Sequence, residues 1–413
     1  MGRSLPGLLS ALLLLLLLPA SLRDQVPAFH RREADGRSGL HPIVLIPGVI
    51  CSDLEARLTE AYRPSTPRCG RMKAKGWFGL WTNRTWAMDP EHAACFVEQM
   101  RLVYDPVLGD FRNLPGVVTR VPNFGSARGF SSKAPRHPEY CLGILRSTLE
   151  RFGYRDGETL FGAPYDLRYA PPLPGQTSRV YSRYYRRLMR LIEDASDKNQ
   201  GKPAIVLGHS FGDAVALEFV RNTPLPWRDR FIRHLFTVAP TWSGGYVKTL
   251  MSVASGPEGL LYVPSATQLS MRSMPLVMTR HRNYSAYDIA DLLVTVGSPD
   301  GVTPFTDHEL AKMEYFDAPM VPMTYMNGVG IPTAERLVYW DDDFDRMPDV
   351  AYGDGDDTIN LISMLAFEEK VGKQPGQKER FKSIQLANIR HSELVTNRWA
   401  LRTIMDEIAE VNR

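Results

Sequence analysis

The feature that most constrains this chain is the stretch Gly-His-Ser-Phe-Gly at residues 208–212, which joins an apolar run to a helical pattern. The run "PAIVL" before it is typical of a buried strand, and "AVALEFV" after it is typical of a buried helix. A serine on such a sharp strand-to-helix turn holds its hydroxyl above the sheet, and flanking glycines avoid steric clashes. We therefore predict Ser210 as a nucleophile; the alternative is a strand-to-loop serine without chemistry.

A nucleophilic serine needs a base, and in this arrangement the partners follow in the order serine, acid, histidine. Four histidines follow the serine: His234, His281, His308 and His391. His391 lies in "NIRHSEL", after the last predicted strand, where the base belongs. His234 precedes a strand and is expected to be structural, whereas the other two fall in an irregular insertion. We predict His391 as the base.

The acid is expected after a strand and before His391, where two acidic clusters occur. The first, "WDDDFD", has the character of a solvated turn. The second, "GDGDDT", has glycines that permit a tight turn before a helix. We predict Asp356 as the acid that holds the tautomer of His391, with Asp354 and Asp357 as alternatives. A calcium loop is not supported, because the D-x-D-x-D-G spacing is absent.

A tetrahedral oxyanion needs two backbone donors. The N–H of Phe211, directly after the nucleophile, is the first candidate. The second should follow an early strand, and "HPIVLIPGV" ends in a suitable turn, so we predict the N–H of Val49. Backbone donors do not depend on the side chain, so an apolar residue is acceptable there.

Buried strand patterns alternate with amphipathic helices along much of the chain, which predicts a mostly parallel sheet covered on both faces. Residues 51–120 have no clear period and are rich in Trp, Arg and Lys. Residues 243–318 are irregular and are expected to form a cap over the site.

The first residues combine Arg3 with a long leucine run and a Pro-Ala-Ser end, which is typical of a secretory signal peptide over residues 1–22. An uncleaved anchor is the alternative, but the run is short for a membrane span. No second span is seen, so we expect a mature protein that is soluble, in a lumen or outside the cell. Asn83 and Asn283 begin sequons and are candidate glycosylation sites.

The four cysteines, at positions 51, 69, 95 and 141, include no CxxC pair, so a zinc site is not expected. They permit three disulfide pairings. The formal charge of +3 is too small to suggest a nucleic-acid partner. We expect neither a metal nor a cofactor, and we expect a monomer.

Together these motifs resemble the lecithin–cholesterol acyltransferase family, including its lysosomal phospholipases and its plant members. The matching segments occur in family order: "VLIPGVICSDLEARL", "RVPNFG", "GYRDGETLFGAPYDLRYAP", "GHSFG", "VAPTWSGG" and "GDGDDT". The similarity covers about residues 42–400. It assigns Ser210, Asp356 and His391 to the family's triad, and Val49 and Phe211 to its oxyanion hole.

The resemblance also implies an α/β-hydrolase fold with two insertions. The core would comprise residues 40–50, 121–242 and 319–413; residues 51–120 would form a membrane-binding lid, and residues 243–318 a cap. The segment between Cys69 and Cys95 looks like the family's disulfide-closed lid, while the pairing of Cys51 and Cys141 stays open.

The chain departs from the family pattern at several positions. Leu167 stands where the family usually has Trp, "APTWSGG" carries an extra residue, Asp213 adds a charge after the nucleophile, and Cys51 directly follows the oxyanion turn. These departures bear on acceptor and acyl-chain preference.

Cations and aromatic residues alternate in "RCGRMKAKGWFGLW". Aromatic residues partition to membrane interfaces and cations to anionic headgroups, so Trp77, Phe78 and Trp81 are predicted to bind a phospholipid membrane or a lipoprotein surface. The alternative is that these aromatics fill the core of a subdomain.

We therefore predict a serine enzyme that takes an acyl chain from a glycerophospholipid through an acyl-serine. The chain would pass to water, as in a phospholipase A, or to a lipid alcohol or sterol, as in an O-acyltransferase. A general secreted esterase or lipase is one alternative, and a non-catalytic lipid-binding protein is another. The expected location is the secretory pathway, with either secretion or retention in a lysosome or vacuole.

Overall fold

The computed structural model describes residues 39–81, 90–130, 141–241, 247 and 274–413. The predicted signal peptide at residues 1–22 and the sequon at Asn83 lie outside these residues. Among the described residues, no helix is both long and apolar enough to cross a bilayer.

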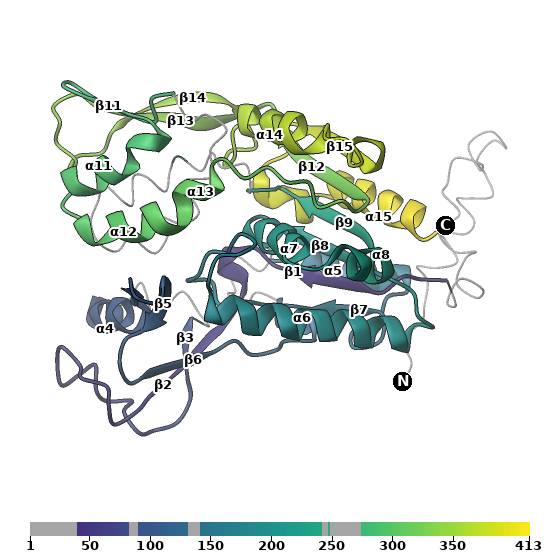
Figure 1. Ribbon diagram of the computed structural model, residues 1–413, viewed down its shortest axis with the longest axis horizontal. Coiled ribbons are helices and arrows are strands. Elements are labelled where there is room, and N and C mark those ends of the chain that lie inside the picture. Colours follow the sequence, from purple (N-terminus) through teal and green to yellow (C-terminus); the bar gives the residue numbers. More distant parts are fainter. Residues whose placement is uncertain (1–38, 82–89, 131–140, 242–246, 248–273) are drawn as a thin grey trace, which may run out of the picture. The chain divides into compact units, whose positions relative to one another are not determined.

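A six-stranded sheet forms the centre of the chain from His41 onward (Figure 1). Every neighbouring pair of strands in it is parallel. In spatial order, the strands are β15 (Phe381–Ala387), β12 (Met323–Val329), β9 (Ile232–Val238), β8 (Ala204–His209), β1 (Ile43–Ile46) and β7 (Leu160–Gly162).

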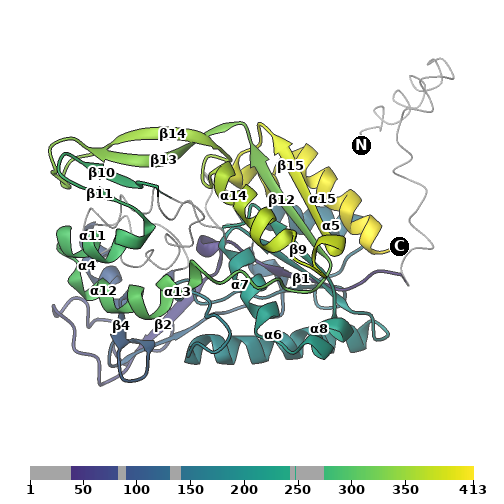
Figure 2. The ribbon, with the colours of Figure 1, turned by 45° about the horizontal axis from the view of Figure 1, so that its top comes forward.

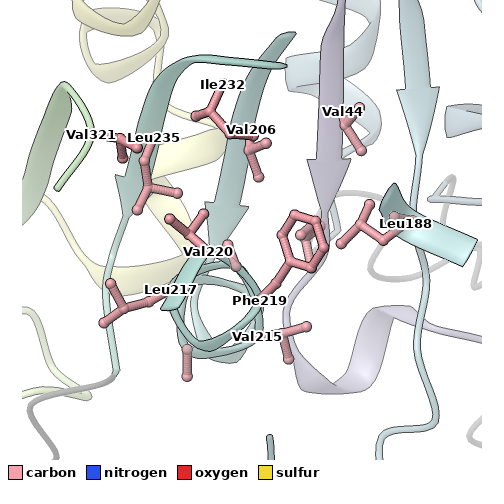
Figure 3. Close-up of a cluster of buried hydrophobic side chains, with 14 of the residues drawn as sticks. Val44, Leu188, Val206, Val215, Leu217, Phe219, Val220, Ile232, Leu235 and Val321 are labelled. Atoms are coloured by element: carbon pink, nitrogen blue, oxygen red, sulfur yellow. The ribbon is translucent and has the colours of Figure 1, made fainter. Parts of the chain in front are cut away.

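Strands β1 and β8 are apolar throughout because both of their faces are covered. Val44 and Val206 point into one large buried cluster together with side chains of the helices on that face (Figure 3). These helices are α6 (Arg179–Lys198), α7 (Phe211–Arg221), α8 (Leu225–Phe231) and α14 (Leu361–Phe367).

The other face of the sheet carries α5 (Gly143–Phe152) and α15 (Arg398–Val411), which contact each other. Their buried side chains, such as Leu149 and Ile404, are fully enclosed. A parallel sheet with helices on both faces and a serine turn after β8 is the α/β-hydrolase fold that the resemblance implied.

Residues 51–120, called the lid below, contain two small antiparallel sheets. Their elements are β2 (Leu54–Leu58), β3 (Phe78–Trp81), α4 (Pro90–Met100), β4 (Leu102–Asp105), β5 (Asp110–Asn113) and β6 (Val117–Arg120). A disulfide joins Cys69 to Cys95, as the resemblance implied.

The lid packs on the core through the "YDLR" segment. Leu167 joins an apolar cluster with lid residues such as Leu54 and Leu80, so the residue that replaces the family's tryptophan belongs to this contact. The buried Arg168 is paired with Asp166 at 2.7 Å and also donates to Thr119 Oγ1 of the lid at 2.9 Å.

A second sheet, of four strands, lies apart from the central one (Figure 2). In spatial order, its strands are β11 (Asn283–Tyr284), β10 (Val277–Thr279), β13 (Ile331–Tyr339) and β14 (Asp349–Gly355). The cap also contains the helices α11 (Ile289–Thr295), α12 (Val302–Pro304) and α13 (Leu310–Lys312), with a π-helical turn, Phe305–Glu309, between the last two.

The boundary of the cap differs from the sequence analysis, which placed residues 331–355 in the core. The hairpin formed by β13 and β14 instead pairs with β10, because Val277–Thr279 and Leu337–Tyr339 are in parallel register. This pairing joins segments about sixty residues apart, which no local pattern reveals.

A second disulfide joins Cys51 to Cys141, the pair that the sequence left open. Cys51 ends the 3₁₀ turn Val49–Cys51, directly after β1. This bond therefore ties the turn that follows β1 to the segment that leads into α5.

We expect removal of the Cys51–Cys141 disulfide, by alanine at both positions, to lower the free energy of unfolding by about 2–5 kcal/mol. The bond spans 90 residues, whereas Cys69–Cys95 spans 26. On the chain-entropy model, losing the disulfide that closes the longer loop should lower the free energy of unfolding by about 1 kcal/mol more than losing the other. Equilibrium denaturation of the two double variants measures this; a larger loss from the Cys69–Cys95 pair would contradict the expected order.

Candidate active site

The backbone of Ser210 adopts a conformation that is rare for any residue other than glycine, with φ 55° and ψ −130°. It lies between β8 and α7, and its N–H donates to the Val238 carbonyl of β9 at 3.0 Å. The strained turn leaves the serine side chain only partly buried, while every residue of β8 is buried. Such strain persists only where the surroundings over-determine it, and it is common at functional sites.

Glycine is required at positions 208 and 212 because other backbone atoms approach closely there. A Cβ on Gly212 would lie 2.3 Å from the Ile46 carbonyl oxygen of β1, and one on Gly208 would lie 2.6 Å from the Cα of Asp213. Neither distance is sterically possible, so α7 can approach the sheet only with glycine at these positions.

Three side chains distant in sequence form a hydrogen-bonded chain at this turn. His391 Nε2 lies 2.9 Å from Ser210 Oγ, and His391 Nδ1 lies 2.8 Å from Asp356 Oδ2. The N–H of His391 also donates to the Asp356 carbonyl at 2.8 Å. The structure thus brings together the serine, the acid and the histidine that the sequence analysis selected.

The Asp356 carboxylate is fully buried and its orientation is fixed by backbone donors. Its Oδ1 accepts from the N–H of Thr358 at 3.0 Å and of Ile359 at 2.7 Å. The two alternative acids are held elsewhere. Asp354 accepts from the N–H of Gly330, and Asp357 pairs with Arg390 at 2.6 Å.

The acid does not follow a strand of the central sheet directly. Asp356 follows β14, an antiparallel strand of the cap sheet, and returns beside β12 at Gly328. A Cβ on Gly328 would lie 1.9 Å from the Ile389 carbonyl oxygen and 3.1 Å from the Asp356 Cβ. The glycine therefore lets the acid loop and the histidine loop meet at the end of β12.

Opposing effects act on the His391 imidazole. Burial lowers its pKa, but the charge and hydrogen bond of Asp356 raise it, and the pKa ends above its ordinary value. His209, with ring centroid 5.7 Å from that of His391, is different: burial, followed by the charge of His391, lowers its pKa to about 3. His209 is therefore neutral at physiological pH, and His391 is the histidine suited to gain a proton.

The two predicted oxyanion donors both occupy the first position of a helical turn. Phe211 begins α7 and Val49 begins the 3₁₀ turn, so neither N–H has a partner within its own turn. The Val49 turn lies at the nucleophile, because a Cβ on the preceding Gly48 would lie 3.2 Å from the Ser210 Cβ. A bond from Trp81 Nε1 to the Ile50 carbonyl, at 3.3 Å, and the Cys51–Cys141 disulfide hold this turn in place.

Asp213 is a charged residue that the sequence analysis noted without foreseeing its burial. It is 1% exposed in the first turn of α7, and its Oδ1 accepts from the N–H of Thr241 at 2.8 Å. Burial raises its pKa to about 7, although bonds from the backbone of Thr241 and Ala214 lower it. The charge of Asp213 raises the pKa of His391, and its effect ranks after that of Asp356. The available signal was the place of Asp213 directly before "AVALEFV", the pattern of a buried helix.

The other three histidines after the serine have separate roles. His234 Nε2 bonds to Thr324 Oγ1 at 2.9 Å, within the sheet. His281 is exposed and pairs with Asp342 at 2.5 Å. The ring of His308 packs against Tyr104, with centroids 5.6 Å apart. Each therefore has contacts of its own away from Ser210.

The three aromatics predicted to bind membrane are half-buried. The ring centroid of Trp81 lies 5.9 Å from that of Phe96, and Phe78 packs among apolar lid residues, so the contacts of both residues favour the subdomain-core alternative. Trp77 lies under the Arg120 guanidinium, at 4.3 Å from its ring centroid.

The candidate glycosylation site Asn283 is exposed on β11. Among the residues the structure covers, no group of His, Cys, Asp or Glu is arranged to hold a metal ion.

Comparison with known proteins identifies the family. The family described as Lecithin:cholesterol acyltransferase matches residues 76–283. A curated relative from rice, lecithin-cholesterol acyltransferase-like 1, is 41% identical over 396 residues, covering 91% of this chain and 88% of its own. This chain belongs to the lecithin:cholesterol acyltransferase family. It is accordingly an enzyme of the acyltransferase and phospholipase class with a serine-hydrolase fold.

A human member of this family, named lysosomal phospholipase A and acyltransferase, is 30% identical over 417 residues and covers 95% of this chain and 93% of its own. Among solved structures, a chain of the Tle4–Tli4 complex matches with a TM-score of 0.52 and 10% identity, covering 90% of this chain and 98% of its own. At that identity the structural likeness concerns the fold alone.

We expect Asp213→Asn to stabilise the protein above neutral pH. Burial raises the folded pKa of Asp213 from 3.8 to about 7, so the stability that its neutral form contributes is fully present below about pH 4 and is lost progressively as pH rises to about 7. Asparagine stays neutral and retains an acceptor for Thr241. The variant should therefore exceed wild type in unfolding free energy at about pH 8, exceed it by less at about pH 5, and come close to it at about pH 4.

Chemical denaturation at these pH values measures this difference. The matched control is Asp194→Asn, an exposed carboxylate on α6, which should show no such pH dependence. An Asp213→Asn protein that loses the same stability at all of these pH values would mean that the carboxylate charge is stabilised in the fold.

Proposed function

We propose that this enzyme transfers acyl chains from glycerophospholipids, with Ser210 as nucleophile, His391 as base and Asp356 as the orienting acid. The observation that carries the proposal is the unbroken set of hydrogen bonds from Ser210 through His391 to Asp356. The names of the relatives, which include acyltransferases acting on lecithin and a phospholipase A, support a phospholipid as acyl donor.

In the first half-reaction, Ser210 Oγ attacks the ester carbonyl of the phospholipid while His391 Nε2 takes the hydroxyl proton. Asp356 accepts from Nδ1–H and stabilises the imidazolium. The N–H groups of Val49 and Phe211 bind the oxyanion, aided by the N-terminal end of α7. When the tetrahedral intermediate collapses, His391 returns the proton to the leaving lysophospholipid, and an acyl-serine remains.

In the second half-reaction, an acceptor hydroxyl attacks the acyl-serine and His391 takes its proton. Water as acceptor yields a free fatty acid, and a lipid alcohol or sterol yields a new ester. In both cases the serine recovers its proton from His391. The triad treats the two acceptors alike, so the ratio of products depends on which acceptor reaches the acyl-enzyme.

The proposed compartment is the secretory pathway, ending outside the cell or in a lysosome or vacuole. Two disulfides support it, because such bonds persist in oxidising compartments. The apolar leader of the sequence and the exposed sequon at Asn283 agree with this location.

A fluorophosphonate probe tests the nucleophile. We expect wild type to be labelled and Ser210→Ala to lose both labelling and phospholipid hydrolysis, with kcat falling by a factor on the order of 10⁵–10⁶. Ser182→Ala, at an exposed serine on α6, is the matched control and should label normally. Normal labelling of Ser210→Ala would place the nucleophile elsewhere, and an unlabelled wild type would favour the non-catalytic lipid-binding alternative.

Product analysis tests the donor and the acceptor. Phosphatidylcholine vesicles are incubated with and without a long-chain alcohol, and free fatty acid is measured against new ester. We expect fatty acid alone in the first case and a share of new ester in the second, since one acyl-enzyme serves both acceptors. Faster turnover of triglyceride emulsion and soluble esters than of phospholipid would support the general esterase or lipase alternative.

We also propose that the lid binds the lipid surface through Trp77. Trp81→Ser is an unsuitable test, because Trp81 donates to the Ile50 carbonyl beside the proposed oxyanion hole. Trp77→Ser should weaken vesicle binding more than hydrolysis of a soluble ester, since the Trp77 ring contacts the surface cations Arg57 and Arg120. Equal losses in the two assays would refute the role.

A further inference from the structure

One face of α6 carries five exposed arginines: Arg179, Arg183, Arg186, Arg187 and Arg190. At 100° per residue they fall within an arc of about 100°, and at 1.5 Å per residue they extend over about 17 Å. The opposite face of the helix is buried through Tyr181, Tyr184, Tyr185, Leu188 and Ile192, so the arginine face is fixed outward. These five residues are called the arginine face below.

The five side chains of the arginine face form no ion pair in the described structure, and the acidic residues of the same helix lie after them, within residues 193–197 at its C-terminal end. Residues 167–192 contain no Asp or Glu at all. Some exposed arginines elsewhere do have acidic partners: Arg128 pairs with Asp156 at 3.3 Å and Arg155 with Glu158 at 3.5 Å.

The local structure keeps this face ordered. Ser178 caps the start of α6 by accepting from the Tyr181 N–H, and Tyr184 donates to the Ala163 carbonyl at 2.8 Å. The Arg187 guanidinium lies 4.1 Å from the Phe124 ring centroid, which restrains it beside the core. The guanidinium groups therefore project from a rigid helix.

The arginine face also begins at the lid. The N–H of Arg179 donates to Asp110 Oδ2 of β5 at 2.8 Å, and both ribbon views place the first turn of α6 near the lid strands. A surface that contacts the lid can thus extend along α6.

We propose that the arginine face of α6 is a docking surface for an anionic phospholipid bilayer. A guanidinium binds phosphate through paired hydrogen bonds, and each basic residue near an anionic leaflet adds to the attraction. Five such groups along a convex helix match a plane of separate headgroups better than one enclosed phosphate. The proposed lipid substrate and the disulfides favour a membrane over a nucleic acid as the partner.

The choice of a lipid partner rests on the proposed function, but the test does not require turnover. All proteins carry Ser210→Ala so that vesicle lipids are not consumed. Binding is measured by cosedimentation with phosphatidylcholine vesicles with or without phosphatidylglycerol, at low and at moderate salt. Probe labelling of the Ser210-containing protein judges the catalytic proposal separately.

The test variant combines Arg183→Gln, Arg186→Gln, Arg187→Gln and Arg190→Gln. The matched control makes the same change in net charge at four exposed arginines of the C-terminal part of the chain, away from α6 in sequence: Arg380→Gln, Arg398→Gln, Arg402→Gln and Arg413→Gln. Thermal melting shows whether each variant is folded.

We expect the parent to bind phosphatidylglycerol vesicles more tightly than pure phosphatidylcholine, in a salt-dependent manner. The affinity of the α6 variant for these vesicles should be lower than that of the parent by more than about tenfold, and most of its salt dependence should be lost. The control variant should keep both the affinity and the salt dependence. Parent-like binding by the α6 variant, or equal losses in both variants, would overturn the proposal. So would an α6 variant that loses binding to heparin while it keeps binding to vesicles.

Discussion

The site depends on the contact between the start of α7 and the ends of β1 and β8. The Gly212 backbone lies against the Ile46 carbonyl so closely that no side chain fits between them. This contact forces Ser210 into its strained conformation and directs its hydroxyl out of the sheet. It also places the first N–H groups of α7 beside the Val49 turn. This one close contact between backbone segments therefore sets the position of the nucleophile. It also sets the positions of the proposed oxyanion donors and of the N-terminal end of α7.

The two carboxylates that raise the pKa of His391 most, Asp356 and Asp213, act in different ways. Asp356 is immobilised by two backbone donors and bonds directly to the imidazole, so its position and orientation are fixed. Asp213 is buried, is bonded to Thr241 rather than to a cation, and has a pKa near neutrality. The electrostatic field at the imidazole therefore includes a contribution from Asp213 that changes with pH near neutrality.

Much of this arrangement could be predicted from the sequence, because the signals are local. Ser210 lies between a strand pattern and a helix pattern, and chain order left His391 and the "GDGDDT" cluster as partners. Of the three neighbouring carboxylates in this cluster, Asp356 is the one that bonds to His391, and the glycines of "GDGDDT" permit the turn that places it there. The fold class followed from alternating strands and helices.

What could not be predicted depends on contacts between distant segments. The pairing of β13 with β10 and the Cys51–Cys141 bond leave no local pattern. The half-burial of Trp81 depends on Phe96 and on the Ile50 carbonyl, which the composition of "GWFGLW" cannot show. The burial of Asp213 likewise depends on how α7 meets Thr241.

The β13–β14 hairpin makes the cap and the proposed catalytic acid parts of one continuous segment. The chain leaves the central sheet after β12, builds half of the cap sheet, and delivers Asp356 on its return. Evolution or engineering therefore cannot exchange this cap as an independent module, as it could a loop inserted between unrelated elements. Any graft must preserve the return path, and a mechanical displacement of the cap sheet is transmitted along β14 to the carboxylate beside His391.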